Sequence, residues 1–254
     1  MANIQKFKAI SFDCYGTLVD WETGLLSALK PWIEQQGKNI DDNEILAAFA
    51  HRESEEEAEV QSAPYPEILE GVHIALAREF KIKSSRALRE EFMNCVGSWP
   101  CFNDTVNALK SLKKDYKLII LSNVDNASFA ETAKKLGIEF DAVYTAQDIC
   151  SYKPQKANFR YLLDHAKADL GLEKQDILHT AQSLFHDHVP AQGFGLKTCW
   201  IDRRGDAGAK KTSGATPSGG ATPSGGATPK PKTPVKPHWT FASMAEFAAA
   251  MKKA

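Results

Sequence analysis

The chain is organised around residues 8–24, which read KAISFDCYGTLVDWETG. Residues 9–12 are mostly apolar, and this run is long enough for one buried strand. It ends on a carboxylate, Asp13, and a glycine turn with Gly16 and Thr17 follows at once. Ligands bind outside the carboxyl ends of the strands in an open α/β sheet, so Asp13 is well placed to act as a nucleophile. Aspartate also caps ordinary turns, and this stretch alone leaves both roles open.

Length and composition are those of an ordinary globular chain. The 254 residues suit one α/β domain with a modest second module, and a 43% hydrophobic share can form a real core. The net charge is -1 without a Lys/Arg cluster, so no nucleic-acid surface is indicated. We expect neither a signal peptide nor a membrane anchor, because no long apolar segment follows Met1. Five scattered cysteines have no metal-ligand spacing and indicate reduced thiols in a cytoplasmic protein.

Residues from about 20 to 97 are expected to form an all-helical insertion after the first strand. Apolar residues recur at helical spacing over 25–33, and Gly37 ends that helix. A second helix follows from about Asp41 until prolines break it, and two further helical patterns cover 68–80 and 84–96. The acidic run at 53–59 in the second helix is expected to be a solvated helix face.

Polar residues follow several of the later predicted strands, which cover 116–121, 140–144, 176–181 and 195–202. Ser122 and Asn123 end the second strand, Lys153 opens a helix after the third, and Asp187 follows the fourth. Each has an ordinary interpretation, such as an Asx turn at Asn123 or a surface position for Lys153. Taken alone, Ser122 and Asn123 favour the ordinary interpretation.

Together these motifs resemble the haloacid dehalogenase superfamily, in which the first Asp of the opening motif is the covalent nucleophile. The phosphatases of that superfamily usually carry a second Asp as general acid where this chain has Tyr15, so the motif is similar to the 2-haloacid dehalogenase branch. The resemblance spans residues 8–204. It implies an α/β fold, a Rossmann-like parallel sheet core at 1–19 and 98–254, with a helical cap at 20–97 that closes over the strand ends.

The resemblance also implies a role for each motif residue. Asp13 would attack the carbon that bears the halogen, Lys153 and Asp187 would position the water that hydrolyses the resulting ester, and Thr17 would hold the nucleophile loop. Ser122 and neighbouring amides would bind the substrate carboxylate. Arg52 matches a halide-binding arginine by position alone, and a surface salt bridge is an equal alternative. The other residues expected to contact substrate are Tyr15 and Asn123 on the halide side and Ser183 of the fourth motif.

The fourth motif departs from both branches of the superfamily. Gln182 stands where the phosphatases have an acid, which would weaken a magnesium site without excluding it. The asparagine of the dehalogenase pattern has no clear counterpart, and Phe159 stands where the dehalogenases have a tyrosine. The spacing of His179, His186 and His188 matches no zinc pattern, so we expect packed or solvated histidines.

The sequence therefore predicts a metal-free and cofactor-free dehalogenase of short 2-haloalkanoic acids. A magnesium-dependent phosphatase acting on a small phosphate ester and a non-catalytic binding protein on the same fold are the alternatives. The expected partner is a small anionic substrate, without nucleic acid or membrane, and a homodimer is possible. Residues 205–237 contain GATPSG repeats and are expected to form a flexible surface loop within the core, before a terminal helix that ends near Met251.

Overall fold

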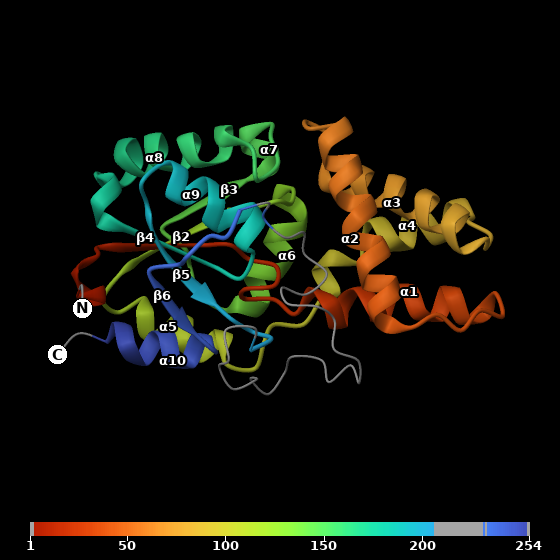
Figure 1. The fold of residues 1–254 in the computed structure, drawn as a ribbon, viewed down its shortest axis with the longest axis horizontal. Helices are drawn as coiled ribbons and strands as arrows, with labels where there is room; N and C mark the ends of the chain where they lie inside the picture. Colours follow the sequence, from red (N-terminus) through yellow and green to blue (C-terminus); the bar gives the residue numbers. More distant parts are fainter. Residues whose placement is uncertain (1–2, 206–230, 232, 253–254) are drawn as a thin grey trace.

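A six-stranded parallel sheet forms the centre of the computed structural model, which describes residues 3–205, 231 and 233–252. Most of the repeat segment predicted at 205–237 therefore lies outside the described residues. The strand order is β3-β2-β1-β4-β5-β6, which puts the first strand in the middle (Figure 1). The strands are β1 (Ala9–Phe12), β2 (Lys117–Ser122), β3 (Ala142–Thr145), β4 (Ile177–Ala181), β5 (Lys197–Ile201) and β6 (Trp239–Phe241).

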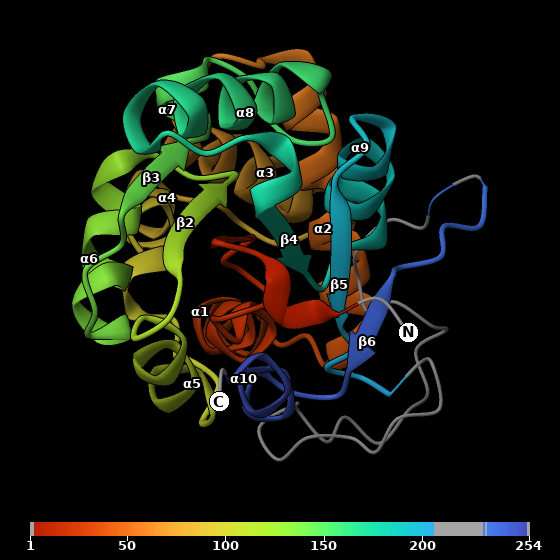
Figure 2. The ribbon, with the colours of Figure 1, turned by 90° about the vertical axis from the view of Figure 1, so that its left-hand side faces the viewer.

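Helices cover both faces of this sheet. They are α5 (Thr105–Leu112), α6 (Asn126–Leu136), α7 (Ala146–Ile149), α8 (Lys156–Leu170), α9 (Val189–Gly193) and α10 (Met244–Met251). Ile10 and Phe12 of β1 belong to one apolar cluster with α5 and α10, whereas Ala9 belongs to a second cluster with α8 and α9. Successive strand residues point to opposite faces, and Figure 2 shows the two helix groups on opposite sides. The parallel sheet confirms the fold class expected from the sequence.

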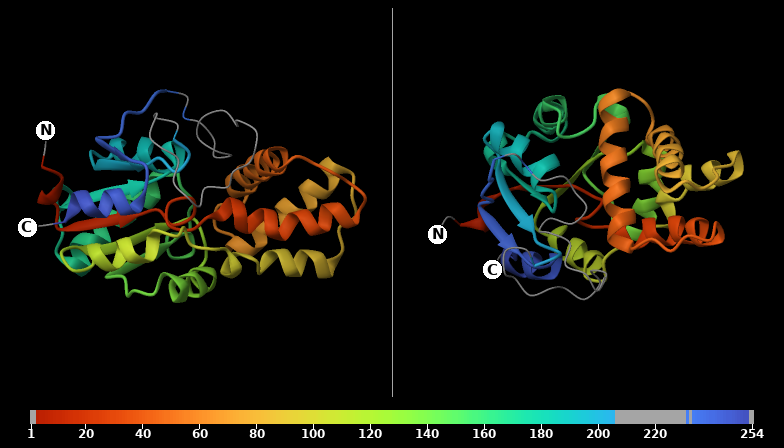
Figure 3. Two further views of the ribbon diagram at one scale, coloured as in Figure 1. Left: turned by 90° about the horizontal axis from the view of Figure 1, so that it is seen from below. Right: turned by 45° about the vertical axis from the view of Figure 1, so that its right-hand side comes forward.

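Four helices are inserted between β1 and β2 and lie beside the sheet, next to the carboxyl ends of its strands (Figure 1). They are α1 (Trp21–Gln35), α2 (Asp42–Glu59), α3 (Tyr65–Phe80) and α4 (Arg86–Met93), and we call them the helical cap. Helix α2 is the cap helix that stands against the core, and α10 lies at the far end of the core (Figure 3). None of the helices in the described part of the chain is long and apolar enough to cross a membrane.

The cap is anchored where the chain enters and leaves it. At the entry, the Asp20 side chain accepts a hydrogen bond from the backbone N–H of Thr23 and caps α1. At the exit, the buried Trp99 packs so tightly on Gly24 of α1 that a Cβ on this glycine would overlap with the indole. Only glycine at position 24 lets the returning chain approach α1 this closely.

Candidate active site

Asp13 lies directly after β1, at the carboxyl edge of the sheet. Its backbone N–H donates to the carbonyl of Thr180 in β4 at 3.2 Å, so the β1–β4 hydrogen-bond pattern continues to Asp13. The side chain is 7% exposed and faces a cavity of about 80 Å³ between the strand ends and the cap. Binding pockets for larger molecules usually measure 300 Å³ or more, so this cavity suits a short substrate.

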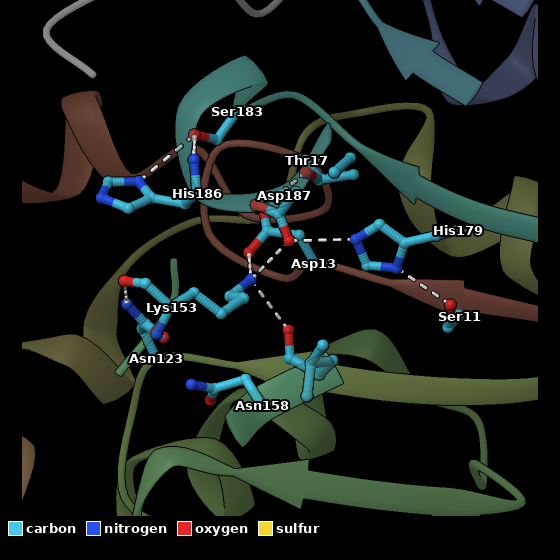
Figure 4. Close-up of polar contacts among 12 residues, drawn as sticks. Ser11, Asp13, Thr17, Asn123, Lys153, Asn158, His179, Ser183, His186 and Asp187 are labelled. Atoms are coloured by element: carbon cyan, nitrogen blue, oxygen red, sulfur yellow. Dashed lines mark hydrogen bonds and ion pairs between the residues drawn. The ribbon is translucent and has the colours of Figure 1, made fainter. Parts of the chain in front are cut away.

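Lys153 links the two carboxylates of the core side of this cavity. Its Nζ donates to Asp13 Oδ1 and to Asp187 Oδ1, each at 2.8 Å, and to the carbonyl of Leu121 at 3.0 Å (Figure 4). The side chain is 2% exposed. Burial opposes the charged form, but the two carboxylates raise the pKa of Lys153 above its ordinary value. The ammonium is therefore permanently charged at neutral pH.

The two carboxylates differ in their surroundings. Burial raises the pKa of Asp13, and Lys153 opposes this shift. Burial also disfavours charge on Asp187, yet Lys153 and His179 together hold the pKa of Asp187 well below its ordinary value. Asp187 Oδ2 is buried and has no hydrogen-bond partner among the described residues. An ionised carboxylate with a free oxygen can accept a hydrogen bond from a water molecule in the cavity and orient it.

Thr17 holds the Asp13 carboxylate from the glycine turn. Its Oγ1 donates to Asp13 Oδ2 at 2.6 Å and accepts from the backbone N–H of Gln182 at 2.9 Å. Gly16 supplies the turn with φ +92°, a conformation that favours glycine. The Arg203 guanidinium, paired with Asp104, donates to the carbonyl of Thr17 at 2.8 Å and fixes the turn from behind. Sequence reasoning did not assign this role to Arg203.

His179 is part of the polar network, although the sequence analysis expected only packing or solvation. Its Nε2 lies 3.0 Å from Asp187 Oδ1, and its Nδ1 lies 2.9 Å from Ser11 Oγ in β1 (Figure 4). The ring is fully buried, with the edge of Phe159 against it. Ser11 and His179 are direct partners in the β1–β4 register. The sequence feature that could have indicated this contact is a pair of polar residues, Ser11 and His179, in two strands that are mostly apolar.

Three predicted substrate residues line the cavity with their polar groups already engaged. The Tyr15 hydroxyl lies 2.9 Å from Thr132 Oγ1 in α6. Asn123 accepts from the backbone N–H of Lys153 at 2.7 Å, and its amide donates to the Lys153 carbonyl at 3.1 Å. Ser183 accepts from the backbone N–H of His186 at 3.0 Å and caps the turn at Leu184–His188.

Two predicted substrate-binding residues, Ser122 and Arg52, do not line the cavity. Ser122 is buried at the end of β2, and its Oγ has no partner within the described part of the chain. Arg52 points to the outside of α2, where its guanidinium binds Glu55 at 2.7 Å and Glu79 at 2.8 Å. The expectation that Arg52 faces the nucleophile is not met, because the rotation of α2 turns it away. The alternative of a surface salt bridge describes its contacts.

Helix α2 instead turns Glu53 and Glu57 toward the cavity. Glu57 is 8% exposed and accepts from the Asn123 amide, at 3.2 Å and 3.3 Å to its two oxygens. Glu53 accepts a hydrogen bond from the Tyr65 hydroxyl of α3. Burial raises the pKa of Glu53 to about 7, and burial and Glu53 raise the pKa of Glu57 well above its ordinary value. The prediction of a solvated face over 53–59 is wrong for these two residues.

Of the four oxygens of Asp13 and Asp187, Asp187 Oδ2 alone has no hydrogen-bond partner among the described residues, which disfavours a magnesium site. Such a site needs carboxylate oxygens free to coordinate the metal. Here the Lys153 ammonium donates a hydrogen bond to one oxygen of Asp13 and to one oxygen of Asp187, and Thr17 donates to the other oxygen of Asp13. Gln182 contributes only a neutral oxygen at the position of the missing acid. No group of three or more His, Cys, Asp or Glu residues arranged for a metal occurs within residues 3–205, 231 and 233–252.

Comparisons with known proteins identify relatives of the chain. The family model of haloacid dehalogenase-like hydrolases matches residues 7–179. The (S)-2-haloacid dehalogenase of Pseudomonas sp. (strain YL) is 31% identical over 108 residues, which cover 41% of this chain and 44% of that protein. The (S)-2-haloacid dehalogenase 4A of Burkholderia cepacia is 23% identical over 208 residues, which cover 80% of this chain and 86% of that protein.

Solved structures share the fold over nearly the whole chain. The L-2-haloacid dehalogenase of Xanthobacter autotrophicus with chloropropionic acid covalently bound has a TM-score of 0.73 and 16% identity, and the match covers 96% of this chain and 97% of that one. The putative hydrolase YfnB of Bacillus subtilis, bound to magnesium, has a TM-score of 0.72 and 16% identity, with 97% and 99% covered. At this identity the similarity establishes the fold alone.

Proposed function

Because the chain belongs to the haloacid dehalogenase-like hydrolases, we propose that it hydrolyses short 2-haloalkanoic acids to 2-hydroxy acids, with Asp13 as the covalent nucleophile. The observation that carries this proposal is the position of Asp13. Its carboxylate faces a small cavity while Lys153 and Thr17 hold it from behind. A carboxylate oriented in this way toward a bound carbon gains much of the rate from orientation alone.

In the first step, an oxygen of Asp13 attacks the carbon that bears the halogen, from the side opposite the halide. The new C–O bond forms as the carbon–halogen bond breaks, and the halide leaves with the electron pair. The product is an ester of Asp13. Lys153 keeps Asp13 ionised before the attack and stays within reach of the ester carbonyl afterwards.

In the second step, water attacks the carbonyl carbon of this ester. Asp187 orients the water by accepting a hydrogen bond from it at its unpartnered Oδ2, and Lys153 stabilises the negative charge that develops on the carbonyl oxygen. The 2-hydroxy acid leaves when its oxygen is protonated, and Asp13 is regenerated. One turnover consumes one water and releases one halide and one proton.

Neither step requires a metal, which agrees with the donor set around Lys153. The phosphatase alternative is less well supported, because it needs a general acid for the leaving alkoxide. Tyr15 stands at that position, and burial raises the pKa of Tyr15 well above its ordinary value. A phenol so reluctant to ionise is a poor proton donor to an alkoxide.

The test is chloride release from L-2-chloropropionate in the presence of EDTA, with Asp13→Asn as the matched variant. We expect sustained release by the natural protein and none by the variant. A single turnover in ¹⁸O water should place the label in the Asp13 carboxyl group. Magnesium-dependent cleavage of p-nitrophenyl phosphate without chloride release would favour the phosphatase, and inactivity in both assays would favour a binding protein.

A further inference from the structure

The cavity contains more acidic groups than its one ammonium group can neutralise. Asp13 and Asp187 line its core side, and Glu53 and Glu57 line its cap side. Within residues 3–205, 231 and 233–252, Lys153 is the single Lys or Arg that lines it, and both core carboxylates already share that ammonium. The cap side therefore has two carboxyl groups without a cation.

Glu53 and Glu57 lie one helical turn apart, so their side chains share one face of α2. Each has a hydrogen-bond donor, Tyr65 for Glu53 and Asn123 for Glu57, but neither has an ion-pair partner in the described part of the chain. The arginine next to them, Arg52, is directed to the opposite side of the helix, where it pairs with exposed acids. Nothing in the cap itself neutralises the pair.

Buried carboxylates are costly unless a cation pairs with them or a proton neutralises them. The walls beside the pair are the aromatic rings of Trp21, Tyr65 and Trp99, which attract cations through their faces. On the core side of the same cavity, Asp187 Oδ2 is buried without a partner among the described residues, so it adds a further negatively charged oxygen that no cation contacts. These features point to a ligand that brings positive charge.

We propose that Glu53 and Glu57 form a subsite for an ammonium group of the substrate. The substrate would then be a short halogenated acid that also carries an amine, with the halogen-bearing carbon at Asp13 and the amine at the cap. The placement of the halogen-bearing carbon at Asp13 rests on the function proposed above. The ammonium subsite itself rests on the charges and walls of the cavity.

The competing explanation is that the two glutamates hold protons and donate hydrogen bonds to an anion. Burial, which raises the pKa of Glu53 to about 7, is consistent with either explanation when the cavity is empty. The titratable and polar groups around the pair are Tyr65 of α3, Asn123 after β2, Tyr152 before Lys153, His186 after β4, and Lys153 with its two carboxylates in the core. The explanations predict opposite pH dependence, because an ammonium binds the ionised pair and an anion binds the protonated pair.

The test measures binding of two unreactive probes by isothermal titration calorimetry at about pH 6 and about pH 8, on either side of the Glu53 pKa. We expect 4-aminobutanoate to bind at least about tenfold more tightly than butanoate at the higher pH, and more tightly there than at the lower pH. The Glu53→Gln/Glu57→Gln variant should lose this preference. The matched control is Glu55→Gln on the exposed side of α2, which should retain it.

Several results would overturn the subsite. One is that butanoate binds as tightly as 4-aminobutanoate or more tightly, or that butanoate binding weakens as the pH rises. Another is that the preference for 4-aminobutanoate survives in the double variant. A third is that 4-aminobutanoate does not bind at about 10 mM. Thermal unfolding verifies that the isosteric glutamine variants are folded. Since the probes carry no halogen, binding does not depend on catalysis. A protein that shows the preference but releases no halide would refute the proposed function and leave the subsite standing.

Discussion

Asn123 of the core and Glu57 of the helical cap are hydrogen-bonded across the cavity, with the Asn123 amide 3.2 Å from Glu57 Oε1. The same amide nitrogen donates to the carbonyl of Lys153 at 3.1 Å. The Asn123 side chain thus connects the cap helix α2 to the loop that carries Lys153. The position of the cap and the position of Lys153 are coupled through this contact.

A double-mutant cycle tests this coupling. Asn123→Ala and Glu57→Ala should each lower kcat/KM for 2-chloropropionate, and the double variant should lose less than the sum of the two effects. Contacting residues of this kind couple by about 0.5–3 kcal/mol. Additive losses would contradict the contact, and the pair Asn123→Ala with Glu55→Ala, whose sites do not touch, is the control.

Lys153→Met should destabilise the fold as well as abolish halide release. It leaves the buried carboxylates of Asp13 and Asp187 side by side without a cation, a change that costs about 3–5 kcal/mol in comparable sites. The deficit should shrink as the pH falls, because a protonated Asp13 needs no counter-ion. Denaturant unfolding at several pH values measures it. Lys134→Met breaks an exposed pair with Glu131 and should cost at most about 1 kcal/mol.

The pH dependence of halide release should report the ionisation of Asp13. Burial raises the pKa of Asp13, and only the ionised form attacks carbon. Activity should therefore be present above the raised pKa and should fall about tenfold per pH unit below it. The fall should begin at a higher pH than it would for an ordinary aspartate, whose pKa is about 3.9. A pH–rate profile of kcat/KM provides the measurement. Activity that stays constant down to that ordinary value would contradict the nucleophile assignment.

Arg52→Gln should leave halide release within about twofold of the natural protein. Its guanidinium is engaged on the outer side of α2 by Glu55 and Glu79, and exposed pairs of this type contribute about 0–1 kcal/mol. Steady-state kinetics with 2-chloropropionate and 2-bromopropionate are the measurement. A tenfold or larger loss of halide release, greater for one halogen than for the other, would instead indicate that Arg52 binds the halide.

His179→Leu should lower kcat with little change in KM. The imidazole contacts Asp187 but does not line the cavity, so its removal weakens the orientation and the ionisation of that carboxylate without removing a substrate contact. We expect a loss of about ten- to a hundredfold, and an acid limb of kcat that moves to higher pH as the pKa of Asp187 rises. His51→Leu, on the exposed face of α2, is the control. An unchanged pH profile would leave His179 with a packing role alone.

The core half of the site was predictable because it follows from local patterns. Apolar runs predict buried strands, and a parallel sheet brings the carboxyl ends of its strands to one edge. Asp13, Lys153 and Asp187 each come after such a run, so the strand order is enough to predict that their side chains lie close together. The resemblance of their motifs to a known superfamily supplied the roles.

The cap half depended on tertiary packing. Successive helix residues differ by about 100° in direction, so which of Arg52 and Glu53 faces the core depends on the rotation of α2. That rotation is set by apolar residues such as Ile45 and Phe49, which pack against the rest of the molecule. Residues 51–59 are almost all polar, so no hydrophobic periodicity indicates which side of this part of the helix is buried. The sequence thus determined that Asp13 and Lys153 follow strands at one edge of the sheet, and only the tertiary structure decided that carboxyl groups, not a guanidinium, face them from the cap.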